Sequence, residues 1–177
     1  MANDLWRTPP EVFKYFDKQY DFQCDVAASD ENHLCDEYYT KFNNALDHNW
    51  AEMQGSIHGS YIWCNPPYSN PLPWVQKAIK ESQAWGVGSV MLLNCDLSVE
   101  WSSLLVNLNC TIIHPTASGS KKDKTYCNGR IAFLNDNNKP IDSNNKSQAF
   151  FIIPPFVRAG RPQTEYIALS DIMKCGS

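Results

Sequence analysis

The sequence predicts an α/β domain built on a mostly parallel sheet, with one antiparallel strand near an edge, supplied by a hairpin late in the chain. Short apolar segments typical of buried strands alternate with segments whose apolar residues recur at helical spacing. Such alternation favours parallel strands, because each helix carries the chain back across the sheet. Two β-like segments, 131–134 and 149–153, flank an asparagine-rich stretch, which predicts the hairpin.

The first predicted helix spans residues 10–18. Thr8 has the hydroxyl of a helix N-cap, Pro9 suits the first helical position, and Glu11 completes a capping box. The apolar face of this helix consists of Val12, Phe13 and Phe16.

The other elements follow in an order typical of α/β folds. A short strand over 20–28 ends in small residues, and a buried strand over 56–64 runs directly into Asn65-Pro66-Pro67-Tyr68. The chain between these strands is too short for two full helix–strand units of about 30 residues each, so this half of the sheet is expected to be abbreviated. Beyond it we expect helices over 73–85 and 99–107 and strands over 88–94 and 110–114.

Composition excludes several classes of protein. The 177 residues include 43% hydrophobic and 19% charged residues, which predicts one packed domain over 1–177. A formal net charge of -4 excludes nucleic-acid binding by bulk charge, although a local basic patch stays possible.

No apolar run approaches the roughly 20 residues of a membrane span. The N-terminus lacks an apolar signal core, and the seven cysteines include no CxxC pair, so we expect a cytoplasmic protein with reduced thiols and no membrane partner.

The sequence does not predict a metal site. Cys24, His33 and Cys35 have no paired partners at ligand spacing, and buried packing is the ordinary role of such cysteines.

The tetrapeptide Asn65-Pro66-Pro67-Tyr68 is the clearest chemical signal. Two prolines remove two backbone donors and leave the Pro66 carbonyl free to accept a hydrogen bond, with the Asn65 side chain as a second acceptor. Two acceptors aimed at one point suit a planar amino group, and Tyr68 offers a face on which a base can stack. The alternative is a plain strand-to-loop exit. Because ligands of open parallel sheets bind at the carboxyl ends of strands, 25–29 and 65–68 should share one crevice.

Several further segments, taken with this tetrapeptide, are informative as a set. In chain order they are Arg7-Thr-Pro-Pro-Glu-Val12, Asp25-Val-Ala-Ala-Ser29, Tyr38-Tyr-Thr40, Ala45-Leu-Asp47 with Trp50, Trp63-Cys-Asn-Pro-Pro-Tyr-Ser69, Pro73-Trp74 and Gly129-Arg-Ile-Ala-Phe133. Over about residues 4–153 this order resembles the short phage-type DNA N-6-adenine methyltransferases (Dam type). The resemblance implies an abbreviated Rossmann-like methyltransferase fold, S-adenosylmethionine as cofactor, and methylation of a flipped adenine in double-stranded DNA.

The resemblance also implies residue roles. Asn65, Pro66, Pro67 and Tyr68 would be catalytic, and Trp6, Thr8, Pro9, Asp25, Ala27 and Asp47 would bind the cofactor. Thr8 would contact its methionine part, Asp25 its ammonium or sulfonium charge, and Asp47 its adenine amine. The structural alternative is a helix cap for Thr8, a turn cap for Asp25 and a solvated helix residue for Asp47. The family's glycine-rich loop is absent, which leaves the ribose-binding residue open, with Asp36 and Glu37 as weaker candidates.

Candidate DNA contacts lie in the loop 115–130, which carries the densest basic cluster: Lys121, Lys122, Lys124 and Arg130. Such a loop can follow phosphates, with Tyr126 beside it to stack, or it can simply be a solvated surface. The asparagine-rich tip 135–147 can read base edges or stay unstructured.

Two rival functions stay open. Asn-Pro-Pro-Tyr also occurs in enzymes that methylate RNA or a protein glutamine, and a catalytically silent relative could bind DNA alone. The oligomeric state is not predicted.

Overall fold

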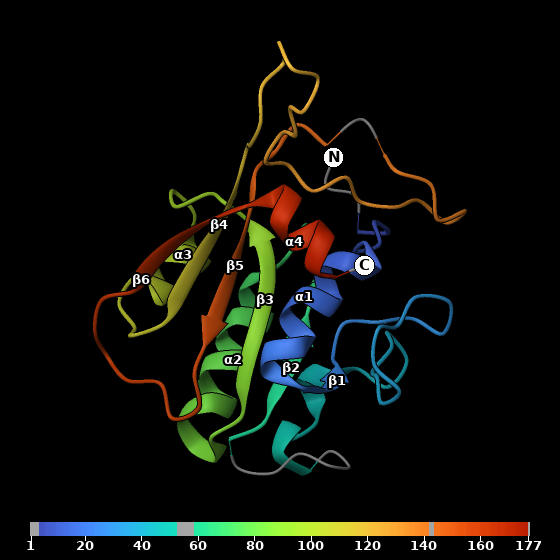
Figure 1. The fold of residues 1–177 in the computed structure, drawn as a ribbon. Helices are drawn as coiled ribbons and strands as arrows, with labels where there is room; N and C mark the ends of the chain where they lie inside the picture. Colours follow the sequence, from blue (N-terminus) through green and yellow to red (C-terminus); the bar gives the residue numbers. More distant parts are fainter. Residues whose placement is uncertain (1–3, 53–58, 142–143, 177) are drawn as a thin grey trace.

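The protein folds as a six-stranded sheet between two layers of helices (Figure 1). The structure, a computed structural model, describes residues 4–52, 59–141 and 144–176. Its elements in chain order are α1 (Pro10–Tyr20), β1 (Phe22–Asp25), the 3₁₀ helices η1 (Ala45–Asp47) and η2 (Trp50–Glu52), β2 (Tyr61–Cys64), α2 (Leu72–Trp85), β3 (Gly88–Asn94), α3 (Glu100–Leu105), β4 (Thr111–Thr116), β5 (Gln148–Ile153), β6 (Gln163–Ala168) and α4 (Leu169–Cys175).

The strand order is β1-β2-β3-β5-β4-β6. β1, β2 and β3 pair in parallel, β5 runs antiparallel between β3 and β4, and β6 pairs in parallel with β4. Five strands therefore point the same way and end at one edge of the sheet, which we call the carboxyl edge. The predicted α/β fold with a mostly parallel sheet is confirmed.

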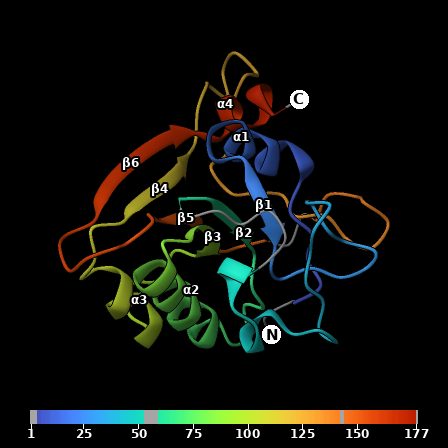
Figure 2. The same cartoon turned by 90° about the horizontal axis from the view of Figure 1, so that it is seen from below.

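Alternate strand residues build two cores, one on each face of the sheet. In β2, Ile62 and Cys64 join the core under α2 and α3, whereas Trp63 joins the core under α1 and α4. Figure 2 shows these two helical layers on opposite sides of the strands. Burial of strand side chains on both faces explains why the strands read as continuous apolar runs.

The predicted hairpin is wrong. Residues 149–153 belong to β5, which pairs with β3 and β4, and therefore lie inside the sheet rather than near its edge. Residues 131–134 form no strand: Leu134 makes only isolated bridges, to Arg7 and Pro140. Phe133 is nevertheless fully buried, so the apolar pattern of this segment reflected packing against the core rather than strand pairing.

The predicted helix cap is also wrong by one residue. The N-cap is Pro9, no side chain caps the helix, and Pro10 occupies the first helical position. Thr8 is buried, and its hydroxyl oxygen instead accepts a hydrogen bond from the Asn65 side chain.

Two C-terminal elements, β6 and α4, were not predicted. β6 lies at the end of the strand order, and its first four residues are exposed, so it lacks the apolar run by which buried strands are found. Between β1 and β2 the described residues form only the two short helices η1 and η2, in line with the expected abbreviation of this half.

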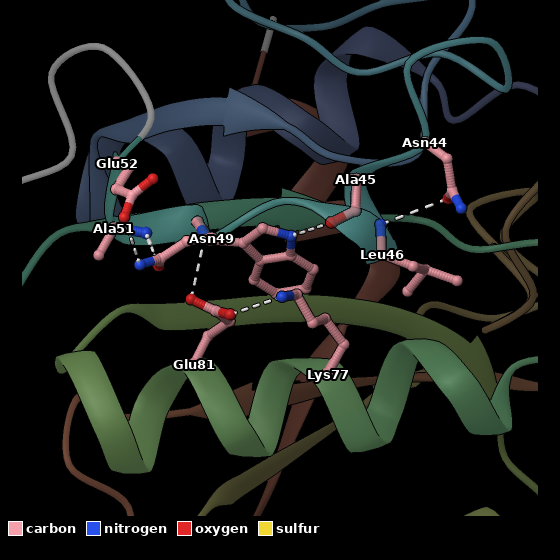
Figure 3. A network of polar contacts seen from close by, with 9 residues as sticks. Asn44, Ala45, Leu46, Asn49, Ala51, Glu52, Lys77 and Glu81 are labelled. Carbon is pink, nitrogen blue, oxygen red and sulfur yellow. Dashed lines mark hydrogen bonds and ion pairs between the residues drawn. The ribbon is translucent and has the colours of Figure 1, made fainter.

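A buried carboxylate fastens η2 to α2. Glu81 of α2 accepts a hydrogen bond from the Trp50 backbone N–H at 3.0 Å, and its other oxygen lies 2.7 Å from Lys77 Nζ. The Lys77 ammonium lies 5.9 Å from the centroid of the Trp50 ring, and the indole N–H donates to the Ala45 carbonyl. Figure 3 shows Lys77 and Glu81 pointing from α2 toward this segment. These contacts hold residues 45–52 against α2.

We expect Glu81→Ala to lower the free energy of unfolding by about 3 kcal/mol, because it leaves Lys77 and the Trp50 amide without their buried partner. Glu81→Gln should lose less, since its amide oxygen can still accept from Trp50. Urea denaturation measures both, with Gln83→Ala on the exposed face of α2 as the matched control. A loss for Glu81→Ala no larger than for Gln83→Ala would show that the network contributes nothing.

Candidate active site

The ends of β1 and β2 lie side by side at the carboxyl edge. Asp25 is the last residue of β1, and the next residue, Val26, donates its amide to the Trp63 carbonyl of β2 at 3.1 Å. Asn65 follows β2 directly. The expected adjacency of 25–29 and 65–68 is therefore confirmed for the two strand ends.

Asn65 and Pro66 present free hydrogen-bond acceptors. The Asn65 Nδ2 donates to Thr8 Oγ1 at 3.1 Å, while its Oδ1 is buried and has no hydrogen-bond partner among the described residues. Among the described residues, no backbone amide donates a hydrogen bond to the Pro66 carbonyl. A buried acceptor without a partner destabilises the folded protein, so such an atom at a strand end indicates a ligand that donates to it.

Tyr68 lies beside two other aromatic residues. Its ring is half-buried and meets Phe133 edge-on at 5.9 Å, and Trp6 stacks on Phe133 at 5.5 Å. The Tyr68 hydroxyl is buried without a partner among the described residues, and burial raises its pKa well above the ordinary value. Tyr68 therefore stays neutral and protonated, which suits stacking rather than base catalysis.

The N-terminal segment, residues 4–8, holds the loop that follows Tyr68. The Asp4 carboxylate accepts from the Ser69 amide at 3.0 Å and from the Ser69 hydroxyl at 2.6 Å. The Pro67 carbonyl accepts from the Asn70 amide and closes a turn. The sequence did not predict the contact of Asp4 with Ser69 or that of Phe133 with Tyr68. Each joins segments far apart in the chain, and local sequence patterns carry no signal for such contacts.

Asp25 is a buried carboxylate that the positive charge of His33 influences but that forms no ion pair with a lysine or arginine of the described residues. It is 4% exposed, and in the described part of the chain no lysine or arginine lies within ion-pair distance. Burial raises its pKa to about 7, although hydrogen bonds from the Ala27 and Leu34 amides favour the ionised form. Asp25 thus does cap a turn, and burial still outweighs these hydrogen bonds and the charge of His33, which leaves room for a positively charged ligand to stabilise the carboxylate.

The other cofactor candidates lie in varied surroundings. Ala27 is half-buried next to Asp25, and the Pro9 carbonyl accepts from the first amides of α1. Asp47 is exposed on η1 and accepts from Asn44 Nδ2 at 3.0 Å. Glu37 lies beside the end of β1, where its carbonyl accepts from the Asp25 amide. Trp6 stacks on Phe133, which in turn contacts Tyr68. No contact joins Asp47 to Asn65 or Asp25 among the residues that the structure describes.

The basic cluster lies on an ordered projection rather than a loose loop. Residues 117–130, which we call the arm, leave the carboxyl end of β4 and extend beyond the sheet (Figure 1). Ser118 and Cys127 pair across it through two backbone hydrogen bonds, and Lys124 adopts a left-handed conformation with φ 57° at its turn. Lys121 and its neighbours are exposed, and Lys121 Nζ lies 5.2 Å from the Tyr126 ring centroid.

Close packing fixes the base of the arm. A side chain at Gly129 would collide with the Thr116 backbone, at 2.7 Å, so this position requires glycine. The Ser118 hydroxyl bonds the Ser170 hydroxyl of α4 at 2.7 Å. Arg130 is exposed beside this base. The arm therefore presents its cations at the same edge of the sheet as Asn65.

The asparagine-rich stretch does not join two paired strands as predicted; Leu134 and Pro140 instead form an antiparallel bridge within it. Residues 142–143 lie outside the described part of the chain, and Asn144 is buried, where it bonds the Ile131 carbonyl and the Gln148 side chain. Asn138 accepts from the Arg7 guanidinium at 3.2 Å. Residues 136–140 are exposed, and Asp136 of this range also lies 4.0 Å from the Arg7 guanidinium.

The described residues contain no group of three or more histidine, cysteine, aspartate or glutamate side chains placed to hold a metal ion. None of their helices is long and apolar enough to cross a membrane.

Comparison with known proteins agrees with this geometry. The family model described as DNA N-6-adenine-methyltransferase (Dam) matches residues 1–177. The DNA N-6-adenine-methyltransferase of Haemophilus phage HP1 (strain HP1c1) is 33% identical over 176 residues, which cover 98% of this chain and 91% of the relative. That of Escherichia phage T1 is 32% identical over 176 residues, which cover 97% of this chain and 71% of the relative. The chain therefore belongs to the DNA N-6-adenine-methyltransferase (Dam) family.

Proposed function

We infer that this chain is an adenine-specific DNA methyltransferase, and we propose that it methylates the exocyclic amine of adenine in double-stranded DNA with S-adenosylmethionine. The observation that carries the proposal is the pair of free acceptors at the carboxyl edge, Asn65 Oδ1 and the Pro66 carbonyl. The target base has to leave the duplex to reach them, as bases do in other enzymes that modify DNA.

Asp25 supports the choice of cofactor. S-adenosylmethionine supplies an electrophilic methyl group on a positively charged sulfonium and also carries an ammonium. A buried carboxylate whose pKa is raised to about 7 gains stability when a cation compensates its charge. We propose that Asp25 and Ala27 hold the charged part of the cofactor, together with Trp6, Pro9 and Asp47 as the resemblance implies. The fold is then an abbreviated Rossmann-like methyltransferase fold.

The roles of the tetrapeptide follow from its acceptors. Asn65 Oδ1 and the Pro66 carbonyl each accept one N–H of the adenine amine, which draws the nitrogen lone pair out of conjugation with the ring. Tyr68 packs against the flat face of the base, and Pro67 holds the turn. Placement and electrostatics supply the rate, and no general base is required because the proton can leave to water after transfer.

In this proposal the chain forms a single domain over 1–177. The arm and the exposed residues 136–140 recognise the target DNA. Lys121, Lys122, Lys124 and Arg130 contact phosphates. An arginine can also read a guanine edge, so Arg130 is the candidate among them for sequence preference.

Asn65→Ala should abolish methyl transfer and leave cofactor affinity within a few fold, because Asn65 faces the target amine. Wild-type protein incubated with S-adenosylmethionine and duplex DNA should yield N6-methyladenine in nucleoside digests analysed by mass spectrometry. The variant should yield at least about hundredfold less. Asn70→Ala, an exposed asparagine in the same loop, is the control.

Two results would contradict this assignment. Methylation of RNA or of a protein glutamine, with none in DNA, would favour the rival enzyme. Loss of cofactor binding by Asn65→Ala would mean that Asn65 serves the cofactor.

The raised pKa of Asp25 predicts that cofactor affinity depends on pH. Below pH 7 the carboxyl is protonated and attracts a cation weakly, so the association constant for S-adenosylmethionine should rise with pH and level off above about 7. The rise is up to about tenfold per pH unit. Calorimetry should show this rise for wild type and for Asp30→Asn, an exposed carboxylate on the same loop, but not for Asp25→Asn.

The same pKa shift predicts the pH dependence of folding without ligand. The folded protein keeps the Asp25 proton up to about pH 7, whereas an unfolded chain loses it near about pH 3.9. The free energy of unfolding should therefore fall as pH rises between these values, relative to Asp25→Asn. Parallel pH profiles for the two proteins would refute the assignment.

Neutralising Lys121, Lys122 and Lys124 together should weaken binding to all DNA sequences alike. If each lysine meets a phosphate, the slope of log affinity against log salt should become less steep by about 0.9 per contact, hence by up to roughly 3. Salt titrations of the triple alanine variant measure this, with Lys14 and Lys80, exposed on α1 and α2, replaced as the control. An unchanged slope would make the arm a solvated surface.

A further inference from the structure

Thr8 has a buried hydroxyl that does not cap the helix that follows it, α1. It precedes α1, but the N-cap is Pro9 and no side chain caps the helix. Thr8 is 3% exposed, and its Oγ1 accepts a hydrogen bond from Asn65 Nδ2 at 3.1 Å. The bond joins residues from two distant parts of the chain.

We propose that Thr8 is a positioning residue, which orients the Asn65 carboxamide so that its Oδ1 faces the target amine. The inference rests on the proposed function, because it deepens the role of Asn65. A carboxamide has a donor end and an acceptor end of nearly the same shape, and rotation by half a turn exchanges them. A threonine hydroxyl can accept from Nδ2 or donate to Oδ1, so the direction of this bond decides which end of Asn65 stays free, and in the structure Thr8 accepts.

The consequence of the wrong orientation is chemical. With the acceptor end toward the ligand, Asn65 can accept an N–H of an amine. With the donor end there, two N–H groups would face each other and repel. By occupying Nδ2, Thr8 leaves the buried Oδ1 as the free end, which is the arrangement observed.

Thr8 can orient Asn65 because the segment around it is held on two sides. Arg7 exchanges two backbone hydrogen bonds with Leu134, both at 2.9 Å. On the other side Asp4 accepts both bonds from Ser69, only a few residues beyond Asn65. The two prolines after Thr8 restrict its backbone further. The hydroxyl is therefore a fixed reference point rather than a mobile contact.

The test compares Thr8→Val, which replaces the hydroxyl by a methyl group of similar size, with Thr8→Ser, which keeps it. Thr8→Val should lower kcat about tenfold, the equivalent of one hydrogen bond. The KM for DNA and the Kd for S-adenosylmethionine should stay within about twofold. Thr8→Ser should restore kcat to within about threefold of wild type. Thr164→Val, exposed on β6, is the control for loss of a threonine hydroxyl.

A second measurement does not depend on activity. In wild type the Asn65 side-chain amide should give an NMR signal, assigned by its loss in Asn65→Ala, with one proton shifted downfield by the bond to Thr8. Thr8→Val should move that signal toward the position of a free amide, and Thr8→Ser should not.

Several outcomes would overturn the inference. Unchanged kcat in Thr8→Val, or an unmoved Asn65 amide signal, would show that the contact does not orient the side chain. Weakened cofactor binding with kcat retained would assign Thr8 to the cofactor.

If wild type makes no N6-methyladenine while the amide signal still moves, the proposed function fails and the orienting contact stands.

Discussion

The parallel pairing of β1 with β2 is the constraint on which the site depends. It places the ends of both strands at one edge, so that Asp25 and Asn65 come from neighbouring strands although they are far apart in the sequence. The chain between them has no room for a helical layer, and this half of the sheet is instead held by Glu81, whose carboxylate binds the Trp50 amide and Lys77. A buried charge with two partners thus replaces the packing that a full helix would supply.

The site itself is built from polar groups that lack partners. Asn65 Oδ1 has no donor among the described residues, and Asp25 forms no ion pair with a lysine or arginine there, while burial raises the Asp25 pKa to about 7 despite the charge of His33. Each arrangement destabilises the folded chain, and the two cores on either face of the sheet offset that loss. Binding of a ligand with a cation and an amine would relieve both, which is the physical reason for proposing S-adenosylmethionine and adenine here.

Exposed positive charge is concentrated on the arm, apart from the candidate active site. The chain is acidic overall, with a formal net charge of -4, yet the arm gathers exposed lysines on a projection anchored to α4 by Ser118. The arm leaves β4 at the same edge as Asn65. In the proposed function phosphates meet the arm, while the cofactor meets Asp25, which forms no ion pair with a lysine or arginine of the described residues.

The sequence by itself determined the α/β class, most strands and helices, and the importance of Asn65-Pro66-Pro67-Tyr68, because these depend on local periodicity and on residue chemistry. It did not determine which strands pair. Segment 131–134 has the apolar pattern of a strand, but Phe133 is buried against Trp6 and Tyr68 instead, and β5 pairs inside the sheet. Thr8 likewise has the chemistry of a helix cap. Only the tertiary structure decided that it bonds Asn65, because a hydroxyl forms the same hydrogen bond with any donor that the fold brings within reach.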